Sequence, residues 1–293
     1  MIRSIVYAML LAGSAMAGSP AMKNGSKVAL VDGYAFVEVV INHRGPFRML
    51  VDSGATSCAM TPDAGRTAGL VYDHQVLLNA ETGGERPIPA AYATVRVESV
   101  EANSVEVLSD RLEGVQRLNT KVDGVLGQSF LGRFPYLVDY QRKRLLLGDD
   151  ARRASVQLGP EVAVTQAFGR IVVAVTLDPE EQLWRVILDM GASGLILQCG
   201  SQCPQLGGLE NAGRIVTNAG DWRVRRGKTA RLEVGGLAIA HAEVYLLDMP
   251  APADHDGLLP ARWFSAVYVD AGRNVVRLAA NVKSRSGTAG RPW

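Results

Sequence analysis

The strongest constraint on this chain is that it repeats itself. Arg48–Thr56 and Arg185–Ser193 both read Arg, three apolar residues, Asp, any residue, Gly, Ala and a hydroxyl residue. Two further words recur in the same order, and the separation of the copies changes only from 137 to 131 residues. Such regularity predicts two homologous halves. The further words are Asp123–Gly127 with Asp256–Pro260, and Tyr136–Asp139 with Val267–Asp270.

The repeats predict a two-domain organisation. An N-terminal lobe is expected at residues 26–150 and a C-terminal lobe at 160–282, joined by a charged, glycine-containing linker near 148–153. Residues 283–293 combine basic side chains with Ser, Gly and Pro, which is typical of a flexible basic tail. Because both lobes lie in one chain, we expect a monomer.

The segments within each half are short, rich in β-branched residues and separated by turn residues, so we predict a mostly β fold. Short helices are expected only after Thr61–Pro62, where Thr can cap and Pro fits the first turn, and around Ser129–Gly132. The expected strands are Val28–Val31, Ala35–Ile41, Arg48–Val51, Thr94–Val100, Ser104–Leu108, Tyr136–Val138, Ile171–Leu177, Val186–Leu188, Thr229–Val234, Glu243–Leu247, Val267–Val269 and Val275–Leu278.

The N-terminus resembles an export signal. Arg3 supplies a positive charge, Ile5–Ala12 is apolar, and Ala15–Ala17 fits a cleavage site, so residues 1–17 are interpreted as a signal peptide. An uncleaved anchor is the alternative, but the apolar run is short and no stop-transfer stretch follows it. Ser14 stands where a lipoprotein would carry Cys. We expect a periplasmic or secreted protein with no stable membrane insertion after cleavage.

The charge balance excludes one large class of partner. With 31 Lys and Arg against 29 Asp and Glu, the formal net charge is only +2. Nucleic-acid binding depends on many Lys and Arg contacts to phosphates, so we expect no nucleic-acid partner. The high apolar fraction, 47%, also excludes a disordered chain.

Export implies an oxidising compartment, in which cysteines can pair. Cys199 and Cys203 are close enough in sequence to form a small disulfide loop, although spacing alone leaves this pairing open. Cys58 has apolar neighbours and no nearby His, which favours a buried free thiol over a nucleophile. None of the four His residues lies in a metal-ligand pattern, so no metal site is expected.

The repeated Asp-x-Gly-Ala words place a carboxylate directly after three apolar strand residues. A single such word is best explained as a solvated turn, since Asp and Gly are common turn residues. Two equivalent words suggest that Asp52 and Asp189 meet between the halves. Like charges a few ångströms apart cannot both ionise, so the pair would share one proton. Gly54 and Gly191 would let the backbone approach and offer N–H donors.

The words also carry a family resemblance. Val51–Thr56 resembles the Asp-Thr/Ser-Gly-Ala signature of aspartic peptidases, and Asp123–Gly127 with Phe130–Leu131 and Val138–Tyr140 is similar to the retropepsin-like bacterial branch, exported and with two tandem lobes. The resemblance implies a bilobal pepsin-like acid protease fold of two pseudo-symmetric β-barrels with an interlobe cleft. It also implies a flap, no cofactor, a polypeptide substrate and catalysis by Asp52 and Asp189.

Two positions depart from the family pattern. Ser53 keeps the hydroxyl that follows the catalytic Asp and bonds across the lobes, whereas Met190 cannot, so one cross-lobe hydrogen bond is expected to be missing. Pro260 stands where the family has Gly, so the loop behind Asp189 is expected to differ. Neither change removes a carboxylate.

Two segments occupy the position of a flap. Gly83 and Gly84 lie between polar residues, which is typical of a hairpin tip, and Trp222 follows a polar turn in the second half. Either segment can instead be a plain surface hairpin. Trp222 can stack on substrate or fold back onto its own sheet.

Three functions fit these observations. The first is an aspartic endopeptidase that activates a water between Asp52 and Asp189. The second is a catalytically impaired peptide-binding protein that retains the protease fold, suggested by Met190 and Pro260. The third, a cysteine-dependent enzyme, rests only on the presence of the three thiol residues.

Overall fold

The computed structural model describes residues 25–79, 85–118, 120–178, 182–200, 202–217, 220–247 and 251–281. Within these ranges strands dominate and helices are short, so the prediction of a mostly β fold is confirmed. The expected signal peptide 1–17 and basic tail 283–293 lie outside the described residues. None of the helices in the described ranges combines the length and apolarity needed to cross a membrane.

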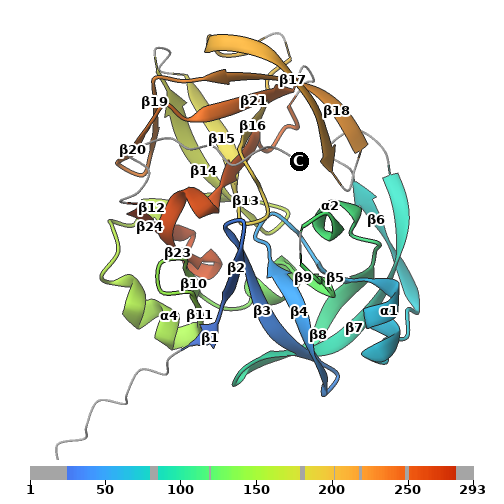
Figure 1. Ribbon diagram of the computed structural model, residues 1–293. Coiled ribbons are helices and arrows are strands. Elements are labelled where there is room, and N and C mark those ends of the chain that lie inside the picture. The colour runs from blue at the N-terminus through green and yellow to red at the C-terminus, as the bar shows by residue number, and fades with distance from the viewer. Residues whose placement is uncertain are drawn as a thin grey trace, which may run out of the picture.

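The N-terminal half forms an eight-stranded sheet, drawn in blue to teal at the lower right of Figure 1. Its strand order is β2-β3-β4-β9-β5-β8-β7-β6, and three short helices, α1 (Pro62–Thr67), α2 (Glu113–Gln116) and α3 (Gln128–Leu131), lie in its connections. The strands are β2 (Ala29–Val31), β3 (Tyr34–Ile41), β4 (Arg44–Val51), β5 (Cys58–Met60), β6 (His74–Asn79), β7 (Glu85–Val97), β8 (Val100–Ser109) and β9 (Gly124–Leu126).

The C-terminal half forms a ten-stranded sheet, drawn in yellow to orange at the top of Figure 1. Its main order is β17-β18-β21-β16-β22-β15-β14-β19-β20, and β13 also pairs with β14. The strands are β13 (Thr165–Ala167), β14 (Arg170–Leu177), β15 (Leu183–Asp189), β16 (Leu195–Gln198), β17 (Gly207–Thr217), β18 (Gly220–Lys228), β19 (Arg231–Val234), β20 (Leu237–Ala240), β21 (Glu243–Leu247) and β22 (Gly257–Pro260).

The repeated words occupy matching places in these two sheets. β4 pairs in parallel with β9, with Met49 opposite Gly124, and β15 pairs in parallel with β22, with Val186 opposite Gly257. In each half the strand that carries the Asp-x-Gly-Ala motif therefore lies beside the strand that carries the second repeated motif, Asp123–Gly127 or Asp256–Pro260. Because the strands flanking these pairs follow the same order in both sheets, each Asp leaves its sheet at the equivalent point.

A six-stranded sheet joins the two halves. Its order is β1-β11-β10-β23-β24-β12, and its centre is the antiparallel pair β10 (Tyr136–Asp139) and β23 (Phe264–Asp270). Leu137 lies opposite Tyr268, so the third repeated word of one half pairs with its own copy in the other. The outer strands are β1 (Ser26–Lys27), β11 (Arg144–Leu147), β24 (Val275–Ala280) and β12 (Val162–Ala163).

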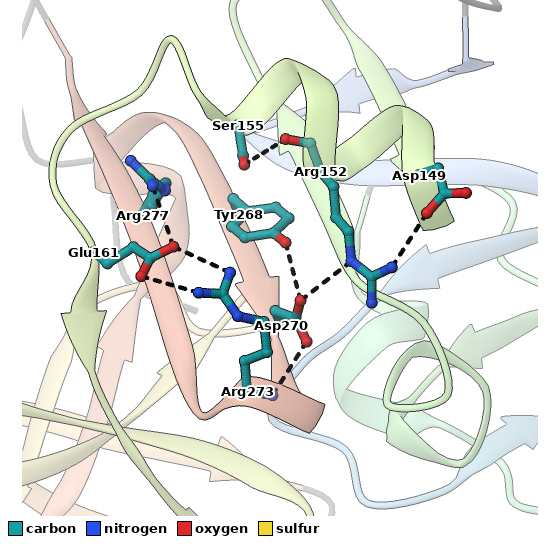
Figure 2. Close-up of polar contacts among 8 residues, drawn as sticks. All are labelled: Asp149, Arg152, Ser155, Glu161, Tyr268, Asp270, Arg273 and Arg277. Carbon is teal, nitrogen blue, oxygen red and sulfur yellow. Dashed lines mark hydrogen bonds and ion pairs between the residues drawn. The ribbon is translucent and has the colours of Figure 1, made fainter.

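The junction between the halves is a helix, whereas the sequence predicted only a linker there. In α4 (Gly148–Ser155) two acidic residues occupy the first turn and two arginines the last, which suits the helix dipole. Figure 2 shows Arg152 of α4 reaching Asp270, the last residue of β23, at 3.5 Å, while the Tyr268 hydroxyl donates to the same carboxylate at 3.2 Å. The figure also shows Glu161 paired with Arg273 and Arg277.

The structure contains a short helix at each of the two expected places, α1 after Thr61 and α3 around Ser129. α1 begins at Pro62 and is capped by the Thr61 hydroxyl, which accepts a hydrogen bond from the Ala64 N–H at 3.3 Å. The predicted strand Thr94–Val100 is wrong at its end, because Glu98 adopts a positive φ of 50° and the chain reverses there into β8. Two short 3₁₀ turns, η1 (Ala261–Trp263) and η2 (Ala271–Arg273), flank β23.

Cys199 and Cys203 form a disulfide, and Cys58 is a buried free thiol. The disulfide follows β16 and closes a loop of sequence separation 4. Removing it through Cys199→Ser with Cys203→Ser is expected to lower the free energy of unfolding by about 2 kcal/mol, because the unfolded chain regains the entropy of a small loop. Urea denaturation measures this loss, and a reductant should destabilise the native chain but not the double variant. Equal stability of both proteins would contradict the expectation.

Candidate active site

The structure brings Asp52 and Asp189 together between the two halves. Asp52 directly follows β4, and Asp189 is the last residue of β15. Their carboxyl groups hydrogen-bond to each other. Asp189 is buried, with 8% of its surface exposed, and Asp52 is half-buried. Two acidic side chains far apart in sequence thus form one compact carboxyl pair.

Gly54 and Gly191 have no side chains, which leaves space for the two carboxyl groups to meet. A Cβ atom added to Gly54 would lie 2.5 Å from Asp189 Cγ, and one added to Gly191 would lie 2.7 Å from Asp52 Oδ2. Each glycine also holds its own aspartate, because the Gly54 N–H donates to Asp52 Oδ1 at 2.8 Å and the Gly191 N–H donates to Asp189 Oδ1 at 2.6 Å. The backbone of each half therefore packs directly on the carboxylate of the other.

Burial raises the pKa of Asp52 above that of an ordinary aspartate. Hydrogen bonds from Asp189 and from the N–H groups of Gly54, Ala55 and Gly191 act in the opposite direction, but burial is the largest influence. Removing a carboxylate from water disfavours its charged form, and a second carboxyl at hydrogen-bond distance makes double ionisation costly. The pair therefore retains a proton to higher pH than an isolated carboxyl would.

The raised pKa predicts a pH dependence of stability. A carboxyl whose folded pKa exceeds its unfolded value, about 3.9 for Asp, stabilises the fold fully below that value and loses this contribution as the pH rises through the folded pKa. We expect the free energy of unfolding to fall more steeply above about pH 4 in the native chain than in Asp52→Asn. Urea denaturation over a pH series measures both slopes, and equal slopes would contradict the assignment.

Ser53, which directly follows Asp52, links the two halves beside the carboxyl pair. Its buried hydroxyl donates to the Leu188 carbonyl at 2.6 Å and accepts from the Met190 N–H at 3.1 Å. Met190 is the equivalent residue of the other half, and its buried thioether side chain carries no hydroxyl to donate in return. The cross-half hydrogen bonding of these two positions is therefore one-sided.

Pro260 occupies the position that corresponds to Gly127, and the segments that follow differ: η1 follows Pro260, whereas α3 follows Gly127. In the N-terminal half a Cβ added to Gly127 would lie 2.3 Å from the Ser57 carbonyl oxygen, so only glycine fits there. In the C-terminal half Pro260 pairs opposite Asp189, and Gly194 stands where the first half has Ser57.

Several residues that the sequence did not reveal lie around the pair. The Gln128 amide donates to the Ser53 carbonyl at 3.1 Å and to the Tyr136 hydroxyl at 3.2 Å. Burial raises the pKa of Tyr136, and the charge of Asp52 raises it further. Burial likewise raises the pKa of Tyr140, followed by the charge of Asp189. Of these residues only Tyr136 lies in a repeated motif, so only its position is marked in the sequence.

The two segments at the expected flap positions are antiparallel hairpins. β6 and β7 pair from His74–Ala90 to Asn79–Glu85, and Gly83 and Gly84 lie outside the described residues, in the connection between these strands. Trp222 belongs to β18, with its backbone opposite Ile215 of β17. β17 also contacts α2 of the N-terminal half, so this hairpin reaches across the halves.

The other recurring acids have structural partners. Asp123 and Asp256 each accept the backbone N–H of the arginine that precedes the apolar strand residues, at 2.9 Å from Arg48 and 2.7 Å from Arg185. Asp139 and Asp270 close the turns that follow their strands. In the described ranges no three His, Cys, Asp or Glu side chains gather in a way that could hold a metal ion.

Comparison with protein families adds an independent finding. Residues 37–133 match the model of a family described as gag-polyprotein putative aspartyl protease. The match lies within the N-terminal half and includes both Asp52 and the Asp123–Gly127 word. It supports an aspartic peptidase function for this part of the chain. Comparison with curated proteins found no match.

Proposed function

We propose that this chain is an aspartic endopeptidase whose two halves act as the lobes of a pepsin-like enzyme, with Asp52 and Asp189 as its catalytic pair. The observation that carries the proposal is the hydrogen bond between these two carboxyl groups across the halves, together with the raised pKa of Asp52. The family match of residues 37–133 supports the same reaction class.

The shared proton gives each carboxyl a separate task. The ionised carboxylate accepts a proton from a water molecule, whose oxygen attacks the carbon of the scissile amide. The protonated carboxyl donates its hydrogen to the carbonyl oxygen as negative charge develops there. The amide nitrogen then takes the proton that the first carboxyl received from water, and the C–N bond breaks. As it breaks, one hydroxyl of the tetrahedral intermediate returns its proton to the second carboxyl, so the pair again holds one proton. No cofactor is required for these steps.

Peptide-library cleavage tests the proposal directly. We expect internal cleavage of unfolded peptides that declines at high pH, once both carboxyls are ionised. A thiol-alkylating reagent should leave this activity unchanged, because the mechanism uses no cysteine and Cys58 is buried. Cleavage abolished by alkylation would instead favour a cysteine-dependent enzyme.

Met190 favours a second candidate function, peptide binding without hydrolysis. The C-terminal half lacks the hydroxyl that would hold its aspartate symmetrically, and a loosely held pair can bind a peptide without activating water. A pepstatin-type inhibitor that binds at the carboxyl pair, with no peptide cleaved at any pH, would support this function and exclude the first.

The proposed setting is outside the cytoplasm. Residues 1–17 are proposed to act as a cleavable export signal, and the mature chain is proposed to work as a monomer in the periplasm or after secretion. The disulfide between Cys199 and Cys203 supports an oxidising compartment.

A further inference from the structure

Arg262 connects the two halves beside the carboxyl pair. It lies in η1, directly after β22 of the C-terminal half. Its Nη1 donates to the carbonyl of Asp32, at 2.5 Å, and its Nη2 donates to the carbonyl of Ser193, at 2.6 Å. Asp32 belongs to the β2–β3 turn of the N-terminal half, whereas Ser193 belongs to the loop that begins at Asp189. One guanidinium group therefore binds a backbone carbonyl of each half.

Two further contacts, with Tyr34 and with the turn at Gly33, fix the position of this guanidinium. It stacks over the ring of Tyr34 at 4.8 Å, and Tyr34 is buried. A Cβ added to Gly33 would lie 3.3 Å from Arg262 Cδ, so the turn lies directly under the side chain. A planar, five-donor cation suits this environment because it stacks on an aromatic face and binds two acceptors at once.

Arg262 and Asp189 both act electrostatically on the buried hydroxyl of Tyr140. Burial raises the pKa of Tyr140 and the charge of Asp189 raises it further, whereas the Arg262 guanidinium opposes both. Together with the hydrogen bond to the Ser193 carbonyl, this places Arg262 at the loop that follows Asp189.

The residue at the equivalent position of the N-terminal half, Ser129, makes no such contact across the halves in the part of the chain that the structure describes. Ser129 follows Asp123 by the same interval at which Arg262 follows Asp256. Its hydroxyl accepts from the Cys58 N–H at 2.8 Å and donates to the Glu106 carbonyl at 2.9 Å, both within its own half. The half that lacks a cross-bonding hydroxyl at Met190 is therefore the half whose Arg262 reaches across.

We propose that Arg262 is a positioning residue that replaces the cross-half hydrogen bond Met190 cannot make and thereby holds Asp189 against Asp52. The inference rests on the proposed function of the carboxyl pair. Its two carbonyl partners belong to the β2–β3 turn and to the loop after Asp189, so losing the guanidinium leaves that loop tied to the N-terminal half only through Ser53 and its surroundings.

Two substitutions separate the geometry of the side chain from its charge. Arg262→Met removes both donors but keeps an apolar stem, and Arg262→Lys keeps the charge on a single ammonium that lacks the planar fork. We expect kcat for peptide cleavage to fall about ten- to a hundredfold in both variants, with KM nearly unchanged, because misplaced catalytic groups slow the chemical step. Native kcat in Arg262→Met would overturn the proposal.

Arg133 offers a matched control. Its Nη1 and Nη2 also donate to two backbone carbonyls, those of Asn103 and Ser104, but all three residues lie in the N-terminal half. Arg133→Met should therefore keep kcat near the native value. If Arg133→Met lost as much kcat as Arg262→Met, any arginine that binds two backbone carbonyls would have the same effect. That result would overturn a specific positioning role for Arg262.

A rescue experiment tests the replacement itself. Met190→Thr supplies the missing hydroxyl, so adding it to Arg262→Met should recover most of the lost kcat. No recovery, with the double variant folded, would overturn the claim that Arg262 replaces this bond.

The proposal remains testable even if the native chain cleaves no peptide, an outcome that would contradict the proposed function alone. The Met190 N–H, which donates to Ser53 of the other half, then serves as the reporter. Its hydrogen exchange should be faster in Arg262→Met and unchanged in Arg133→Met. Unchanged exchange in Arg262→Met would overturn the positioning role independently of catalysis.

Discussion

Replacing either Asp52 or Asp189 by Asn is expected to lower kcat for peptide cleavage by about three orders of magnitude. Asparagine keeps the size of the side chain and can still hydrogen-bond across the pair, but it cannot accept a proton from water or share one with its neighbour. Because the two carboxyls act as a unit, the double variant should be hardly less active than either single variant.

The measurement is single-substrate kinetics on a cleaved library peptide, with thermal unfolding to establish that each variant folds. Asp123→Asn is the matched control, because an amide oxygen can still accept the Arg48 N–H that Asp123 binds. It should retain nearly native activity. Comparable turnover in Asp52→Asn or Asp189→Asn would exclude the proposed mechanism, whatever the cleavage pattern.

Gly54→Ala is expected to lower kcat about a hundredfold. The added methyl would lie 2.5 Å from Asp189 Cγ, well inside van der Waals contact, so the carboxyl of the opposite half must move. Gly191→Ala should act on Asp52 in the same way. Neither glycine has a positive φ, so the backbone tolerates alanine and the damage is confined to the carboxyl pair.

Steady-state kinetics and thermal unfolding of the same samples distinguish displacement from unfolding. Gly272→Ala provides the control, because its added Cβ would lie at an ordinary distance of 3.6 Å from the nearest contacting atom, Asp270 Oδ1. It should be fully active. A Gly54→Ala variant with native kcat would show that the carboxyls can separate without loss of function, contrary to a shared-proton mechanism.

Much of the fold follows from features that act locally. Short apolar runs rich in β-branched residues predict strands such as Ala35–Ile41 and Ile171–Leu177, and Thr61–Pro62 predicts the start of α1. The hairpins β6–β7 and β17–β18 are indicated only by their turn residues, because β7 contains proline and charged residues and β17 contains glycine and charged residues. The charged residues of α4 are equally typical of a linker, so they do not predict a helix.

The site was predictable only where it is duplicated. Repetition pointed to Asp52 and Asp189 and to the glycines beside them, since equivalent residues in two halves can meet at a pseudo-twofold axis. Arg262 and Tyr140 carry no such signal, because neither has a residue of its own type at the equivalent position of the other half and both find their partners through tertiary packing. Comparison of the repeats reveals asymmetry inside the repeated motifs, as at Met190 and Pro260, but not residues outside them whose partners depend on tertiary packing.

The central pairing of β10 with β23 limits how this molecule can open. The two halves share a continuous backbone ladder in addition to the covalent connection through α4, so they cannot swing apart at the connecting segment without breaking that ladder. We expect relative movement of the halves to take place mainly as twisting of the joint sheet. The spacing of Asp52 and Asp189 is therefore expected to stay nearly constant when the halves move.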